Sequence, residues 1–260
     1  MLSWRLSSER GSTMPSVYLS PSTQEYNPYI TGSGSEEYWM NQIADAMEPS
    51  LRANGIRYGR NDPDTSAAAA IRRGNAGNYD FYLALHSNAS GSGTDEGSAR
   101  GIVAFYYPTS ANGKRGAELI AEHLRRIYPL PDRVTTRPTT ALGEVRQPRM
   151  PSVLVEIGYH DNTADALWIE SSVVAIAREL VQALTDYFGL PFTDICMDRP
   201  GTVATAGGAL NLRSAPSTEA VILTQMPNGA VLTVCGRLNG WYTVEYNGLR
   251  GYASADYIRA

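Results

Sequence analysis

The 260-residue sequence is poor in the residues that mark disulfide-rich, nucleic-acid-binding and membrane-embedded proteins. It has two cysteines, Cys196 and Cys235, which are too few for a disulfide framework or a cysteine-based zinc site. We expect two free thiols, with a single bridge between them as the alternative. The formal charge of −4 offers no basic surface for nucleic acid. No apolar run approaches the ~20 residues of a membrane span.

The first thirteen residues, MLSWRLSSERGST, lack the apolar stretch of a secretory signal peptide. Met14 directly precedes the first strand-like run. We therefore interpret residues 1–14 as a leader, a tag or a wrongly assigned start, and we leave them out of the fold prediction.

Short apolar runs alternate with helical patterns from Val17 to about Phe188. Strands are expected at 17–20, 56–60, 81–87, 101–107 and 151–159. Helices are expected after Ser35, after Ser66, at about 113–128 and at about 164–189. This alternation predicts an α/β fold with a mostly parallel sheet sandwiched by helices. Ligands of such sheets bind beyond the carboxyl ends of the strands.

The remainder of the chain has a different character. Residues 191–201 read as a linker, and five short strands separated by turn signals follow within 202–260. Asn239-Gly240 and Asn247-Gly248 are strong hairpin signals. We predict a first domain at 15–190, a linker at 191–201, and a small all-β SH3-like barrel at 202–260.

Three residues of the first domain are candidates for chemistry. His86 ends an apolar strand, at the edge where a site is expected, although a hydrogen-bonded structural histidine fits equally well. Glu156 lies inside the apolar run PSVLVEIGY, so its carboxylate needs a cation, a metal or hydrogen bonds. Pairing with Arg146 or Arg149 is the structural alternative. Burial would raise the pKa of Glu156 toward the range of a general base.

Glu37 is the third candidate, in the first turn of the helix that follows Ser35. One imidazole and one carboxylate are suitable zinc ligands, and a second carboxylate beside them could deprotonate a metal-activated water. The other histidines are weaker candidates. His123 falls off the apolar stripe of its helix and is expected to be solvated. His160 follows the strand of Glu156 and either reaches the site or is structural.

The segments SEEYWMN, YLALHSNAS and MPSVLVEIGYHDN resemble the zinc-dependent N-acetylmuramoyl-L-alanine amidases of the type 3 family. That family hydrolyses the bond between N-acetylmuramic acid and the L-alanine of the peptidoglycan stem peptide. The resemblance covers about residues 15–189. It implies Glu37 and His86 as zinc ligands, Glu156 as the catalytic glutamate, and Arg146 as an arginine near the active site. Glu37 is preferred to Glu36 because the family ligand stands four residues before an asparagine, here Asn41.

The sequence departs from the family pattern after its first strand. The family has Asp-Pro-Gly-His-Gly there, with the histidine as a zinc ligand, whereas this sequence reads SPSTQEYN. This start resembles a divergent SPSxQ branch of the family, in which Gln24 is expected to contact the metal or its water. Glu25 is the alternative ligand.

The C-terminal segment resembles a bacterial SH3 (SH3b) domain through GALNLRSAPSTEA, NGAVLTV and NGWYTVEYNGLRGYASADYI. Such domains commonly tether hydrolases to peptidoglycan. Its aromatic residues either contact the wall or fill a small core, and the core is favoured for Trp241 and Tyr252. The resemblance implies a zinc-dependent peptidoglycan amidase that acts outside the cell at the wall. A catalytically inactive wall-binding or regulatory protein is the alternative, because the first histidine is missing.

Overall fold

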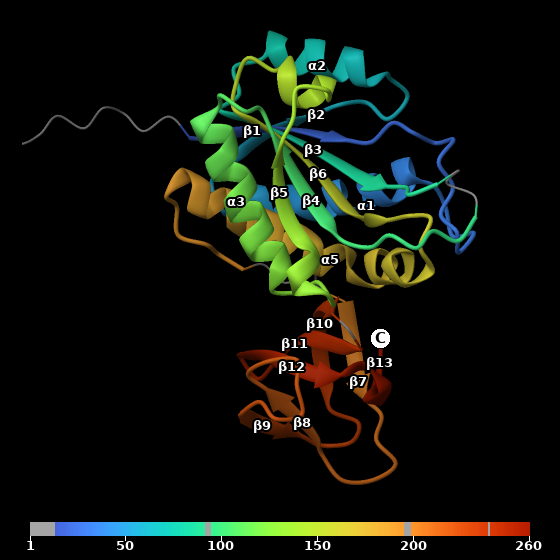
Figure 1. Cartoon of the computed structure of the whole chain (residues 1–260). Helices are drawn as coiled ribbons and strands as arrows, with labels where there is room; N and C mark the ends of the chain where they lie inside the picture. The colour runs from blue at the N-terminus through green and yellow to red at the C-terminus, as the bar shows by residue number, and fades with distance from the viewer. Residues whose placement is uncertain (1–13, 92–94, 195–198, 239) are drawn as a thin grey trace, which may run out of the picture.

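The computed structural model describes residues 14–91, 95–194, 199–238 and 240–260, which form two parts with separate cores (Figure 1). The first part holds a sheet whose strands follow the order β2-β1-β3-β6-β4-β5. Its strands are β1 (Ser16–Pro21), β2 (Arg57–Arg60), β3 (Phe81–Asn88), β4 (Ile102–Tyr106), β5 (Val134–Pro138) and β6 (Ser152–Tyr159). All neighbours pair in parallel except β4 and β6. The predicted mostly parallel sheet is therefore confirmed.

Helices cover both faces of this sheet. One face packs against α1 (Glu36–Ala53), α3 (Ala111–Arg125) and α5 (Thr163–Phe188). The other face packs against α2 (Ala67–Ala76) and α4 (Gly143–Arg146). The predicted layered α/β fold is confirmed. Strand β5 and helix α4 were not predicted, because elements this short carry too little periodicity to be recognised.

Side-chain caps fix where the helices begin. The predicted cap Ser35 accepts a hydrogen bond from the backbone N–H of Tyr38, so Glu36 is the first residue of α1. Ser66, Ser110 and Asn162 cap the other long helices in the same way. Gly189 ends α5 with φ of 70°, a left-handed conformation that glycine adopts without strain.

The alternation of side chains along β3 decides which residues reach the site. Phe81, Leu83 and Leu85 pack into the core under α1, α3 and α5. Tyr82 and Ala84 face the smaller core under α2 and α4. Because the side-chain period of a strand is two, His86 belongs to the α4 side, at the carboxyl end of the strand.

The second part is an antiparallel sheet with the order β13-β7-β10-β11-β12-β8-β9. Its strands are β7 (Arg199–Val203), β8 (Leu210–Arg213), β9 (Ile222–Met226), β10 (Val231–Leu238), β11 (Trp241–Tyr246), β12 (Leu249–Ser254) and β13 (Ile258–Arg259). The small all-β class is confirmed. Strand β7 begins inside the expected linker and pairs with β10, so Arg199–Gly201 belong to the sheet. Trp241 and Tyr252 are partly buried, whereas Tyr257 is exposed.

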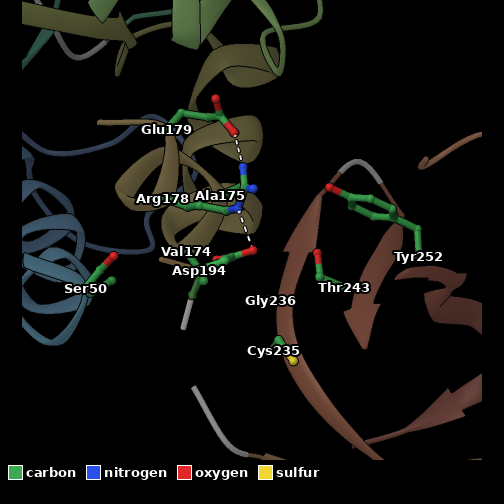
Figure 2. Close-up of a pocket in the computed structure, with 11 residues that line it drawn as sticks. Ser50, Val174, Ala175, Arg178, Glu179, Asp194, Cys235, Gly236, Thr243 and Tyr252 are labelled. Carbon is green, nitrogen blue, oxygen red and sulfur yellow. Dashed lines mark hydrogen bonds and ion pairs between the residues drawn. The ribbon is translucent and has the colours of Figure 1, made fainter. Parts of the chain in front are cut away.

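The two parts meet where α5 packs against β10 (Figure 2). A Cβ atom added to Gly236 would lie 3.1 Å from Cγ1 of Val174, so glycine allows this close approach. Asp194 joins the two sides, because its Oδ2 lies 3.1 Å from Arg178 Nε of α5 and 3.3 Å from Arg250 Nη1 of β12. A pocket lined by apolar and charged groups lies at this junction, and its lining includes neither His86 nor Glu156.

Two sequence predictions are corrected by these parts of the fold. Cys235 is disulfide-bonded, so the expectation of a free thiol is wrong for this residue, and Cys196 lies outside the described residues. His123 is fully buried rather than solvated, because it packs between α3 and α5 within hydrogen-bond distance of Glu179 and Asp186. None of the described helices is long and apolar enough to cross a membrane.

Candidate active site

His86 is the centre of a buried polar cluster at the carboxyl edge of the sheet. Its Nδ1 lies 2.8 Å from Oε1 of Glu36, and its Nε2 lies 2.9 Å from Oε2 of Glu144. Burial opposes the charging of His86, but hydrogen bonds to Glu144 and Glu36 outweigh it and raise the pKa to about 10. The site therefore stabilises positive charge at this imidazole.

The structure brings Glu36 to His86, whereas Glu37 is a partly exposed neighbour without a contact to it. Glu36 shares the buried face of α1 with Met40, Ile43 and Met47, because residues four, seven and eleven positions apart lie on one side of a helix. Glu37 faces away from this side. The apolar spacing of α1 could therefore have identified Glu36 from the sequence, while the family spacing from Asn41 favoured its neighbour.

Hydrogen bonds hold the Glu36 carboxylate in its ionised form. Oε2 accepts from Asn27 Nδ2 at 2.7 Å, and Oε1 accepts from the backbone N–H of Ser87 at 3.4 Å. Burial works against ionisation, but the hydrogen bonds from His86, Asn27 and Ser22 keep the pKa of Glu36 below its ordinary value. This carboxylate is a buried, oriented anion beside an imidazole.

Glu144 is a second buried carboxylate at His86, and sequence reasoning missed it. Its Oε1 accepts from Ser20 Oγ at 2.5 Å and from Tyr82 OH at 2.8 Å, while its Oε2 faces His86. The residue comes from the four-residue helix α4, which has no sequence pattern strong enough to predict. Ser20 and Tyr82 face the α4 side of their strands, so strand alternation could have placed these two beside His86.

Glu156 stands directly beside His86 in the sheet. The two residues are register partners on the parallel strands β3 and β6. Its Oε2 is buried and has no hydrogen-bond partner. Burial, reinforced by the charges of Glu36 and Glu144 and partly offset by His86, raises the pKa of Glu156 to about 7. No ion pair joins it to Arg146, Arg149 or another arginine of the described residues, so the structural alternative gains no support.

A bulge re-aims the chain next to this pair. The register between β3 and β6 shifts after His86 and Glu156, and Gly158 has φ of 71°. Bulges are frequent beside active sites, where they change the direction of a side chain. His160 supports this edge from below, because its Nδ1 lies 2.9 Å from the carbonyl oxygen of Ser87 and its ring stacks on Tyr29. Its role in the structure is support rather than contact with His86.

Gln24 lies at the same point from the segment that follows β1. Its Nε2 is 3.3 Å from both Glu36 Oε1 and His86 Nδ1. Its Oε1 accepts from Tyr26 OH and Asn27 Nδ2. Glu25, the alternative to Gln24, is exposed and makes no contact with this cluster. Gln24 thus reaches the place where the sequence comparison expected it.

The charges of the cluster favour a bound dication. Three carboxylates, those of Glu36, Glu144 and Glu156, converge on one imidazole, and none of them forms an ion pair with lysine or arginine within the described chain. Buried carboxylates require compensating positive charge. A proton on His86 supplies a single positive charge, which leaves the cluster negative.

The donor set fits zinc. The atoms Glu36 Oε1, His86 Nδ1 and Gln24 Nε2 form a triangle with sides of 2.8, 3.3 and 3.3 Å. Tetrahedral zinc, with ligand distances of ~2.0–2.1 Å, separates its ligands by roughly 3.3 Å. A 180° rotation of the Gln24 amide would turn its oxygen into this triangle. No cluster of three or more histidine, cysteine, aspartate or glutamate ligands is found among the residues described, because the third position belongs to an amide.

An open cleft gives access to the cluster. Its walls come from the end of β1, the segment after it and the start of α2, and His86 and Glu144 lie at its base. Tyr26, which is 77% exposed, stands at the rim. Arg146 is exposed on α4 and donates a hydrogen bond to the carbonyl of Thr140, so the structure does not bring it to His86.

These features define an α/β domain with a carboxylate–imidazole site at the carboxyl edge of its sheet, followed by a small β domain. The family model for N-acetylmuramoyl-L-alanine amidase (Amidase_3) matches residues 22–186, and the model for the bacterial SH3 domain matches residues 208–259. The chain belongs to this N-acetylmuramoyl-L-alanine amidase family and carries a C-terminal bacterial SH3 domain.

Curated relatives agree with this assignment. The chain is 29% identical over 164 residues to N-acetylmuramoyl-L-alanine amidase LytC of Bacillus subtilis (strain 168), covering 60% of this chain and 32% of that protein. It is 29% identical over 132 residues to N-acetylmuramoyl-L-alanine amidase CwlM of Bacillus licheniformis, covering 50% of this chain and 49% of that one. The chain thus spans a third to a half of the length of these two relatives.

Solved structures share the fold of the first domain. An N-acetylmuramoyl-L-alanine amidase from Clostridium difficile 630 superposes with a TM-score of 0.60 at 18% identity, covering 68% of this chain and 98% of that one. AmiC2 of Nostoc punctiforme gives a TM-score of 0.60 at 18% identity, covering 69% and 99%. At this identity the likeness establishes the fold.

Proposed function

We propose that this chain is a zinc-dependent hydrolase that cleaves the amide bond between N-acetylmuramic acid and the L-alanine of the peptidoglycan stem peptide. The observation that carries the proposal is the placement of Glu156, with its unpartnered buried oxygen, beside the His86–Glu36 pair. Membership of the amidase family supports the choice of substrate.

Glu36, His86 and Gln24 are the proposed zinc ligands, with Glu36 in place of the neighbouring Glu37. A zinc ion bound there would polarise the scissile carbonyl and lower the pKa of a bound water to ~7. Amide oxygen is a weaker ligand than the imidazole of the family pattern. The excess negative charge from Glu144 and Glu156 compensates by attracting the dication.

Glu156 is the proposed general base and acid. Its carboxylate accepts a proton from the attacking water as the water oxygen bonds to the carbonyl carbon. The same carboxyl then donates that proton to the nitrogen of L-alanine as the C–N bond breaks. The products are a lactyl carboxylate on the sugar and a stem peptide with a free amino terminus. A pKa of about 7 suits a group that both accepts and donates a proton near neutral pH.

The partner and the place of action follow from the two domains. The cleft beside α2 is open enough to admit a polymer strand, and the SH3 domain would hold the enzyme on peptidoglycan. The site of action is then the cell wall, outside the cell. Arg146, exposed on α4, remains a prediction for substrate contact rather than for bond cleavage.

The proposal is tested by zinc content and cleavage in the same preparations. Elemental mass spectrometry of the purified full chain should find near-stoichiometric zinc in the wild type and little in His86→Ala. Peptidoglycan treated with the wild type should gain free L-alanine amino termini, and His86→Ala should release none. Wild-type protein that binds peptidoglycan without zinc and without cleavage would overturn the proposal in favour of a wall-binding protein.

A further inference from the structure

Glu144 is the one carboxylate of the cluster that the proposed reaction leaves without a role. It is 5% exposed, and it belongs to α4, an element separate from those that supply Glu36 and Glu156. A buried carboxylate costs considerable free energy unless hydrogen bonds or a positive charge satisfy it. Its persistence at the centre of the site calls for a physical explanation.

The contacts of Glu144 show that it is already saturated. Oε1 accepts from the hydroxyl groups of Ser20 and Tyr82, and Oε2 lies 2.9 Å from His86 Nε2. A carboxylate bound by three donors on both oxygens is poorly placed to coordinate a metal as well. It also lies on the opposite side of the imidazole from Glu36 and Gln24.

We propose that Glu144 is the positioning residue for the His86 ligand, which rests on the zinc site proposed above. By accepting a hydrogen bond from Nε2–H, Glu144 keeps the proton on Nε2 and leaves the lone pair of Nδ1 for the metal. The choice of tautomer and ring orientation is how an outer carboxylate supports a histidine ligand.

Ser20 and Tyr82 complete the device by fixing Glu144 itself. Ser20 is on β1 and Tyr82 is on β3, so the carboxylate is anchored to two strands of the rigid sheet. Both residues are buried. The His86 ring is thereby held from β3 at its backbone and from β1 and β3 through Glu144.

The test compares Glu144→Gln with Tyr82→Phe in the full chain. Glu144→Gln keeps the size of the side chain but removes its charge, and its amide can turn an N–H donor toward Nε2. We expect its zinc dissociation constant, measured by competition with a chromophoric chelator, to rise ~10–100-fold. Tyr82→Phe removes one hydrogen bond to Glu144 and leaves the carboxylate–imidazole contact, so its zinc dissociation constant should stay within about threefold of the wild type.

A spectroscopic readout separates positioning from a loss of folding. In zinc-loaded protein with ¹⁵N-labelled histidine, long-range ¹H–¹⁵N spectra should show His86 as the Nε2–H tautomer in the wild type and in Tyr82→Phe. His86→Gln assigns the resonance. In Glu144→Gln the Nε2–H signal should shift and exchange faster with water, while circular dichroism and the melting transition show an intact fold.

The outcomes distinguish the two proposals. If the wild type binds zinc and Glu144→Gln binds it equally tightly with an unchanged His86 spectrum, the role of Glu144 is wrong and the proposed function stands. If the wild type binds no zinc, both proposals fail together. If Glu144→Gln does not fold, Glu144→Asp provides the second variant. It keeps the charge but shortens the reach to Nε2, so weaker zinc binding in a folded Glu144→Asp supports positioning and wild-type binding contradicts it.

Discussion

His86 and Glu156 are register partners on the neighbouring parallel strands β3 and β6, at the carboxyl edge of the sheet. Their side chains therefore project to the same face, one beside the other. The first is held between two carboxylates, and the second has a buried oxygen without a partner. This pairing of a proposed metal ligand with a proposed base is the relationship from which the predictions below are drawn.

Replacing Glu156 by glutamine should remove turnover and spare the metal. Glu156→Gln has the same shape but cannot accept the proton of the attacking water. We expect kcat to fall by ~10²–10⁴-fold, with KM and zinc content unchanged. Release of L-alanine amino termini from peptidoglycan measures the first, and elemental mass spectrometry measures the second. Wild-type kcat in this variant would rule out Glu156 as the base.

The pKa of Glu156 also predicts the acid side of the pH profile. The group must be deprotonated to act as a base, and its pKa without metal is about 7. A bound dication would lower this value. The acid limb of kcat/KM should therefore have its midpoint at or below pH ~7 and fall about tenfold per pH unit below it. A limb with its midpoint above pH 8 would contradict this assignment.

The same pKa shift predicts the pH dependence of stability in zinc-free protein. Folding raises the pKa of Glu156 from 4.5 to about 7, so the folded chain binds the proton more tightly than the unfolded chain. That contribution is complete below pH 4.5 and is lost as the pH rises through 7. Wild type should therefore lose up to roughly 3 kcal/mol relative to Glu156→Gln between acidic and alkaline pH. Urea unfolding of both proteins at pH 5 and pH 8 measures this difference, and equal differences at the two pH values would contradict it.

Glu36→Gln and Glu37→Gln form a matched pair of adjacent substitutions. Glu36 contacts His86 from the buried face of α1, whereas Glu37 does not. We expect Glu36→Gln to lose zinc and activity together and Glu37→Gln to keep both within about threefold. Zinc titration and peptidoglycan cleavage on each protein test the pair. The opposite result would restore Glu37 as the ligand that the family spacing indicates.

Gln24→His should strengthen the metal site. The Gln24 amide occupies the third corner of the ligand triangle, where the family pattern has an imidazole. Imidazole is a better zinc ligand than an amide oxygen. We expect the zinc dissociation constant of Gln24→His to fall at least about tenfold, and Gln24→Ala should raise it. Equal zinc affinities in all three proteins would place Gln24 outside the metal site.

The sequence predicted those parts of the fold and site that depend on local periodicity. Strand-end His86 and the apolar run around Glu156 were recognisable because a polar group interrupts or ends a buried strand. Helix α1 and its cap Ser35 followed from the same rules. Helical periodicity also contained Glu36, because it lies four residues before Met40 on the buried face, but the family spacing took precedence.

The remainder depends on tertiary contacts that no local pattern encodes. Glu144 comes from a helix of four residues, and only packing against the sheet gives it its contacts with Ser20 and Tyr82. His123 lies off the apolar stripe of α3, yet it is buried because α5 supplies carboxylates on that side. The strand β7 was taken for linker because its Pro-Gly content is typical of loops, while its pairing with β10 is set by distant residues.

The most direct test of the account is the identity of the bond that the zinc-loaded full chain breaks in purified peptidoglycan. Mass spectrometry of the released fragments should find stem peptides with a free L-alanine amino terminus and glycan strands with intact lactyl carboxylates. Glu156→Gln should release neither. Fragments cut within the glycan or within the stem peptide, or no soluble fragments from zinc-loaded wild type, would contradict the account.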